Sequence, residues 1–183
     1  MLGIVLLLLP TYAVSQIPQR LGFFPGTAPS LYKFLQQQPK DTLIATLASE
    51  GDFIPTFAQR SVLAAAEYSI PYHWGYYAKL RQRIMDNISA QYSQDLSAIK
   101  AFIVQYNLQF WLVAKNAFFV SYLTNNPWLM QYQPAASQAI ANLNANKKPI
   151  LPQLKPCTVF EDENNYLLQT DCILKATESI PAD

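Results

Sequence analysis

One stretch of this chain, residues 52–77, holds most of the side chains that could do acid–base chemistry. Asp52 and Glu67 lie on either side of a short apolar run, and the only histidine, His73, follows closely. Two carboxylates held close together are what general acid–base catalysis requires, and a histidine titrates near neutral pH. A small enzyme using His73 with Glu67 or Asp52 is therefore one hypothesis. Exposed carboxylates and a surface histidine are the simpler interpretation.

The same stretch holds residues that suit binding. Arg81 and Arg83, together with Tyr76 and Tyr77, could hold a phosphate or a sugar, because arginine binds phosphate bidentately and aromatic rings stack on sugar faces. Arg60 could pair with Asp52 or Glu67, or could neutralise the last carbonyls of a short helix. A solvated helix face and core packing explain these residues equally well. No catalytic residue is assigned, and the predicted substrate-proximal residues are Asp52, Arg60, Glu67, Tyr72, His73 and Tyr76.

Several kinds of site are not expected. The sequence contains none of the zinc, calcium, P-loop, dinucleotide or serine-hydrolase motifs HExxH, CxxC, DxDxDG, GxxxxGK[ST], GxGxxG and GxSxG. The net charge is +1, so no basic field for nucleic acid exists. We therefore expect no metal, no cofactor and no nucleic-acid partner. One sequon, Asn87-Ile88-Ser89, has meaning only in a eukaryotic secretory pathway.

The elements that must position these residues alternate between helices and strands. Apolar runs at 42–47 and 61–66 predict buried strands, and residues 110–113 predict a third. Apolar stripes over 76–92 and 93–107 predict two helices between them. Since crossovers between such strands are right-handed, the order predicts a small three-layer parallel sheet of about three strands with flanking helices, an α/β fold. The candidate residues would follow the second strand at its carboxyl edge, where open sheets bind ligands.

The sequence also predicts where some helices begin and end. Ser30 is the predicted N-cap of a short helix that runs to Gln38, and Ser93 is the predicted N-cap of the helix at 93–107. Asn107 can end that second helix in a left-handed conformation.

Two cysteines near the end of the chain flank a predicted β-hairpin. If residues 164–165 form a two-residue loop, counting outward places Cys157 directly opposite Cys172. Directly paired residues at a hydrogen-bonded site have Cα atoms about 5.5 Å apart, which a disulfide can bridge. The spacing favours a disulfide and hence an oxidising compartment, whereas two free buried thiols are the alternative.

The N-terminus is strongly apolar. Residues 2–14 form an apolar run of 13 residues that includes Pro10, which is shorter than the roughly 20 residues of a membrane-spanning helix. The run can be the end of a transmembrane helix whose upstream part lies outside this sequence, a signal peptide or short anchor, or a buried soluble segment. The absence of a basic n-region and the position of Pro10 favour the first. The expected organisation is a membrane segment at 1–15, a linker at 16–29, an extracytoplasmic domain at 30–174 and a polar tail at 175–183.

Three segments, LYKFLQQQPKDTLIATL, FAQRSVLAAAEY and YNLQFWLVAK, follow one another in a characteristic order. Through them, residues 29–174 resemble the extracytoplasmic domain that follows the last transmembrane helix of polytopic GT-C-type glycosyltransferases. The resemblance is greatest to cyanobacterial membrane proteins of unassigned function. It implies a location in the periplasm or an equivalent extracytoplasmic space.

In that superfamily the catalytic acidic residues lie in loops between early transmembrane helices, and the donor is a lipid-phosphate-linked sugar. The resemblance therefore carries no catalytic residue to this chain, and only Arg60, Glu67, Tyr72 and His73 have a counterpart region. It implies a non-catalytic domain, a fragment or split-gene product, that supports transfer from a lipid-linked sugar beside missing upstream helices or a transmembrane partner subunit. A secreted or anchored glycan-binding module, with its site at residues 67–77, is the alternative.

Overall fold

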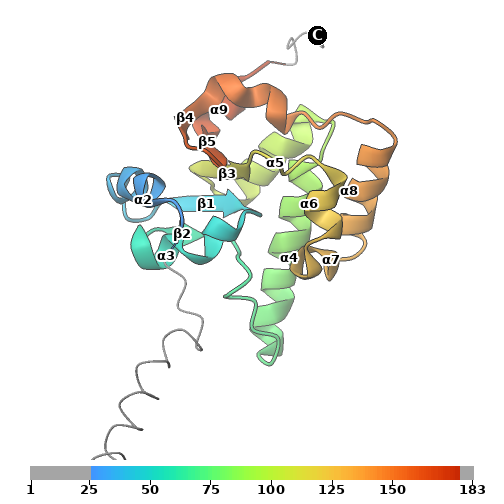
Figure 1. Cartoon of the computed structure of the whole chain (residues 1–183), viewed down its shortest axis with the longest axis horizontal. Helices are drawn as coiled ribbons and strands as arrows, with labels where there is room; N and C mark the ends of the chain where they lie inside the picture. Colours follow the sequence, from blue (N-terminus) through green and yellow to red (C-terminus); the bar gives the residue numbers. More distant parts are fainter. Residues whose placement is uncertain (1–25, 178–183) are drawn as a thin grey trace, which may run out of the picture.

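A five-stranded mixed sheet forms the centre of the computed structural model, which describes residues 26–177 (Figure 1). The strand order is β2-β1-β3-β5-β4, with β1 parallel to β2 and β3, and β5 antiparallel to β3 and β4. The predicted α/β fold is confirmed, and the C-terminal hairpin adds two strands to the three expected. The strands are β1 (Leu43–Thr46), β2 (Ser61–Val62), β3 (Phe110–Ala114), β4 (Thr158–Glu161) and β5 (Asn165–Gln169).

The helices pack around this sheet in two hydrophobic clusters. One cluster combines the strands with α2, α5 and α9, and Trp111 of β3 lies fully buried in it. The other lies beyond the ends of β1 and β2 and joins α4, α6, α7 and α8, which gather on the right of Figure 1. The helices are α2 (Pro29–Gln36), η1 (Ser49–Asp52), α3 (Ile54–Phe57), α4 (Trp74–Gln91), α5 (Leu96–Tyr106), α6 (Val120–Thr124), α7 (Pro127–Met130), α8 (Ala135–Asn144), η2 (Leu151–Cys157) and α9 (Thr170–Lys175).

Two of the predicted helix starts are wrong. The N-cap of α5 is Asp95, whose carboxylate accepts the backbone N–H of Ser97 at 2.7 Å, while the Ser93 hydroxyl accepts the N–H of Asp95. Helix α2 begins at Pro29 after Ala28 and has no side-chain cap, so Ser30 lies inside it. Proline replaces the cap there because it has no N–H to satisfy. Asn107 ends α5 in the left-handed conformation, as predicted.

The disulfide between Cys157 and Cys172 is confirmed, but the predicted register of the hairpin is wrong. The Asp162 carboxylate accepts the backbone N–H groups of the next two asparagines and closes a longer loop, so strand pairing begins at Glu161 and Tyr166. Cys157 ends η2 and Cys172 lies in α9, with Cα atoms 5.5 Å apart. The bond therefore joins two helical segments rather than two strands, and it fits an oxidising compartment.

The apolar N-terminal run, the linker up to residue 25 and the tail from residue 178 lie outside the described residues. Within residues 26–177, no helix combines the length and the apolar character that are needed to cross a bilayer.

Candidate functional site

The structure brings the Asp52 carboxylate to the backbone of Glu67. Asp52 ends η1, and its carboxylate accepts the backbone N–H of Glu67 at 2.8 Å. The Tyr68 hydroxyl donates to the Asp52 carbonyl at 3.3 Å. Burial raises the pKa of Asp52, and the nearby Glu67 carboxylate adds to the rise. The Glu67 side chain itself is exposed, so the pair is joined through the backbone rather than through a shared proton.

Arg60 is buried and bonds only to backbone carbonyls within the described part of the chain. Its guanidinium donates to the carbonyls of Gln36 and Gln38 at the end of α2 and to those of Ala58 and Gln59 just after α3. None of these bonds reaches Asp52 or Glu67. The interpretation of Arg60 as the partner of terminal helix carbonyls is the one that this geometry supports.

Among the described residues, the side chains of Tyr72 and His73 make no hydrogen bond with either carboxylate. Tyr72 is 75% exposed, and its ring lies 4.9 Å from that of His73. Among the described residues, His73 makes no hydrogen bond or ion pair with Asp52 or Glu67, and it lines none of the cavities described below. The structure thus shows no hydrogen bond between His73 and either of the two carboxylates that the enzyme hypothesis offers as its partner. Residues 26–177 also contain no group of three acidic, histidine or cysteine side chains that could hold a metal ion.

Two of the predicted residues do share a cavity. A cavity of about 450 Å³ lies beside the edge strand β2, and Arg60, Tyr68, Tyr76 and Arg83 are among its lining residues. The Tyr76 hydroxyl donates to the Tyr68 carbonyl at 3.0 Å, which fixes its ring across the cavity. We call this space the β2-side cavity.

A second cavity, which sequence reasoning missed, lies at the carboxyl ends of β1 and β3. The chain leaves β1 toward β2 on one side, and it leaves β3 toward the other side, where β5 and β4 lie. Diverging connections of this kind leave a crevice, which is where open sheets bind ligands. Here the crevice holds about 360 Å³ and is lined by Ser49, Glu50, Lys115, Asn116 and Asn164 among others. We call it the switch-point cavity.

Glu50 is the buried carboxylate of the switch-point cavity, with 4% of its surface exposed. The Thr27 hydroxyl and N–H donate to one carboxylate oxygen, and the Tyr32 hydroxyl of α2 donates to the other. Burial raises the pKa of Tyr32, and its hydrogen bond to Glu50 raises it further. The next residue must be small, since a Cβ at Gly51 would lie 2.8 Å from the Thr46 methyl group.

Lys115 supplies the positive charge of the same cavity. Its ammonium lies 2.7 Å from the Glu161 carboxylate, and its backbone N–H donates to the Asn164 carbonyl at 2.8 Å. By contrast, the side chains of Ser49, Asn116 and Asn164 make no hydrogen bond within the described residues, so they are available to a ligand. Lys115 and Asn116 directly follow β3 and come two and three residues after the third predicted strand, at 110–113, and that position was the sequence signal for this site.

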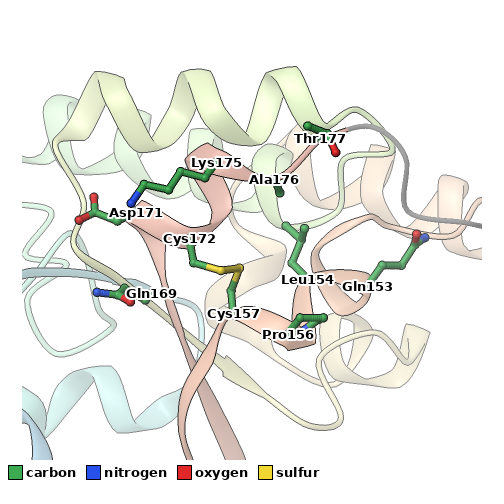
Figure 2. A pocket seen from close by; sticks show the side chains of 10 residues that line it. All are labelled: Gln153, Leu154, Pro156, Cys157, Gln169, Asp171, Cys172, Lys175, Ala176 and Thr177. Carbon is green, nitrogen blue, oxygen red and sulfur yellow. A yellow bond between two sulfur atoms is a disulfide. The ribbon is translucent and has the colours of Figure 1, made fainter.

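The disulfide lines a further cavity of about 560 Å³ between η2 and α9 (Figure 2). Figure 2 shows Cys157 and Cys172 at its centre, with Asp171 and Lys175 on the helix above. Asn87, the acceptor of the sequon, lies elsewhere and is fully buried, with its amide donating to the Thr46 carbonyl at 2.9 Å. It cannot be glycosylated in the folded protein.

Comparisons with known proteins extend the description of the fold. No protein-family model matches the chain, and no curated protein does. The structure is similar to that of the C-terminal globular domain of an oligosaccharyltransferase from Archaeoglobus fulgidus, with a TM-score of 0.50 at 9% sequence identity. The similar region covers 80% of this chain and 99% of that domain. At such low identity the likeness shows the fold alone, and this fold agrees with the resemblance to C-terminal domains of GT-C-type proteins.

Proposed function

We propose that this chain is the extracytoplasmic domain of a GT-C-like membrane protein. In this proposal it supports transfer from a lipid-linked sugar and supplies no catalytic group itself. The observation that carries the proposal is the fold, because nearly the whole archaeal oligosaccharyltransferase domain, 99% of it, is matched. The Cys157–Cys172 disulfide supports the extracytoplasmic location.

The domain would act through a binding surface beside membrane-embedded catalytic helices. These helices belong either to upstream sequence outside this chain or to a separate transmembrane partner subunit, and the apolar run at residues 2–14 would hold the domain close to them. The switch-point cavity suits a sugar or another polyhydroxylated group. The Ser49 hydroxyl and the amides of Asn116 and Asn164 can donate and accept hydrogen bonds there, and Lys115 adds a cation.

Deletion and complementation in the organism that carries the gene test this function. Deletion should raise the amount of lipid-linked sugar and lower the amount of transferred product, and the full chain should restore both. An Asn116→Leu chain, which keeps the fold but blocks the switch-point cavity, should restore neither. Val104→Ala, at an exposed site on α5, should behave as the wild type. Unchanged lipid-linked sugar after deletion would contradict the proposal.

A stand-alone glycan-binding module is the second candidate, and the β2-side cavity favours it. Two tyrosines and an exposed arginine line that cavity, and aromatic rings with an arginine suit a sugar ring. Titration of the full chain with soluble oligosaccharides tests it by calorimetry. Binding that Tyr76→Ala abolishes and Asn116→Leu leaves intact would place the glycan in the β2-side cavity. The reverse pattern would place it in the switch-point cavity.

A further inference from the structure

An aromatic surface lies at the beginning of α4, and only one of its residues, Tyr76, also lines the β2-side cavity. We call Tyr72, Trp74 and Tyr76 the aromatic tip, and they are 75%, 80% and 47% exposed. Figure 1 shows this end of α4 projecting away from the sheet at the bottom of the view. From residue 68 to residue 78 the sequence carries no acidic, lysine or arginine residue, so the tip carries no such charge over its whole length.

Trp74, in the middle of the tip, has little internal reason to be aromatic. Within the described residues the Trp74 indole N–H has no hydrogen-bond partner, and a Cβ built on Gly75 meets no atom within 4 Å. Trp111, in contrast, is fully buried, and Trp128 donates its indole N–H to the Ser69 hydroxyl at 3.2 Å. Tryptophan and tyrosine that extend into solvent together, with one apolar and one polar end each, are typical of a membrane–water interface.

Basic residues follow the tip at the spacing that an anionic lipid surface needs. Between residues 68 and 85 the charged side chains are Lys79, Arg81 and Arg83, all positive. At 1.5 Å per helical residue they lie about 8–14 Å along α4 from Trp74. With this spacing, the aromatic rings can lie in the membrane–water interface while the cations stay on its aqueous side. There the anionic lipid headgroups attract the cations. Lys79 and Arg83 are exposed, and Arg81 donates to the Gln133 carbonyl.

The tip also lies on the side where the described chain begins. Thr27 donates to the Glu50 carboxylate near the start of η1. At the end of η1, the Asp52 carboxylate accepts the backbone N–H of Glu67. Two hydrogen bonds connect the tip to η1. The Tyr68 hydroxyl donates to the Asp52 carbonyl, and the Tyr68 carbonyl accepts the Tyr76 hydroxyl. In the sequence, the apolar run ends at residue 14, only 12 residues before Gly26, which limits their separation to roughly 40 Å. A membrane that held this run would therefore be within reach of the tip.

We propose that the aromatic tip inserts into the interface of an anionic lipid membrane. The rings of Tyr72, Trp74 and Tyr76 would lie at headgroup level, and Lys79 and Arg83 would face the lipid phosphates. The inference rests on the extracytoplasmic membrane location in the proposed function. It adds a second contact with the bilayer, which would orient the cavities relative to the membrane surface.

Tryptophan quenching tests the insertion with the full chain reconstituted in phosphatidylglycerol vesicles that contain shallowly brominated lipid. Wild-type emission should be quenched several-fold more than that of Trp74→Phe, since Trp111 is fully buried and Trp128 is half-buried. In the Trp74→Phe background, Val104→Trp is the matched control. Val104 is 68% exposed and lies near the end of α5, by the amino end of β3. Its tryptophan should not be quenched.

The charge of the lipid provides a second arm. Lys79→Gln together with Arg83→Gln should lower the quenched fraction on phosphatidylglycerol by roughly fivefold per charge and change little on phosphatidylcholine. Equal quenching of the wild type and Trp74→Phe would overturn the proposal. So would a Trp74 that is shielded from aqueous acrylamide without being quenched by lipid, because that result would assign the tip to a contact with a second copy of the chain. No sugar enters these measurements, so failure of glycosyl transfer and failure of insertion are distinguished.

Discussion

Replacement of Arg60 by methionine should destabilise the fold strongly without acting on a ligand. The buried guanidinium satisfies four carbonyls, those of Gln36, Gln38, Ala58 and Gln59. Methionine keeps most of the apolar stem but donates nothing. At about 1 kcal/mol for each acceptor left without its donor, the free energy of unfolding should fall by about 4 kcal/mol. That is a large part of the roughly 5–15 kcal/mol that a domain has.

Urea unfolding of the full chain, followed by circular dichroism with the disulfide intact, measures this loss. The midpoint should fall with an unchanged slope, because the native fold is weakened rather than altered. Arg60→Lys should recover about half of the lost free energy of unfolding. An ammonium has three donors but lacks the planar fork that lets arginine reach the carbonyls of α2 and those after α3 together. Arg83→Met is the matched control and should stay within about 0.5 kcal/mol, because Arg83 is exposed. An Arg60→Met chain as stable as the control would refute the structural role and restore Arg60 as a substrate-proximal residue.

Three further predictions follow from single contacts. Replacing Cys157 and Cys172 by serine opens a loop of 15 residues and should cost about 3 kcal/mol in chemical denaturation, and an unchanged midpoint would mean that the bond is absent in the native chain. Since burial raises the pKa of Asp52, Asp52→Asn should stabilise the fold by under about 1 kcal/mol at neutral pH. The gain should vanish as the pH falls below the ordinary aspartate pKa of about 3.9, and a gain that persists there would exclude the ionised carboxylate as its source. Gly51→Ala should cost about 1–3 kcal/mol by crowding the Thr46 methyl group 2.8 Å away, and Thr46→Ser should recover most of it in the double variant if crowding is the cause.

The strongly periodic parts of the fold could be read from the sequence. Helices α4 and α5, strand β3 and the left-handed Asn107 were predicted within a few residues, because apolar spacing alone determines which face each element buries. Strand β2 was predicted too long. The neighbouring β1 has only four residues, and after Val62 the chain bends toward α4, so the buried alanines that follow pack without pairing. A sequence pattern records that burial but not the length of the partner strand.

The candidate site illustrates the same limit. The rule that ligands bind at the carboxyl edge was applied to β2, because polar and aromatic residues follow that strand. In the structure β2 is an edge strand, so no connection diverges on its outer side, and the switch point lies instead between β1 and β3. The strand order decides this, and the order depends on contacts between distant segments. Glu50 and Lys115 were therefore missed, although each follows a strand that was predicted.

Both buried charges of this region depend on α2. Glu50 lies near the beginning of the segment between β1 and β2, and its carboxylate accepts the hydroxyl of Tyr32 in α2. Arg60 lies at the end of that segment, and its guanidinium donates to carbonyls at the end of α2. The segment is thus held from both ends by one helix. Its first residues line the switch-point cavity, and its last residues line the β2-side cavity. A change in α2 that shifts Tyr32 should reshape the first cavity, and one that shifts Gln36 should reshape the second. Both cavities therefore depend on α2, whereas the sheet lines them with different strands, β3 and β5 for the first and β2 for the second.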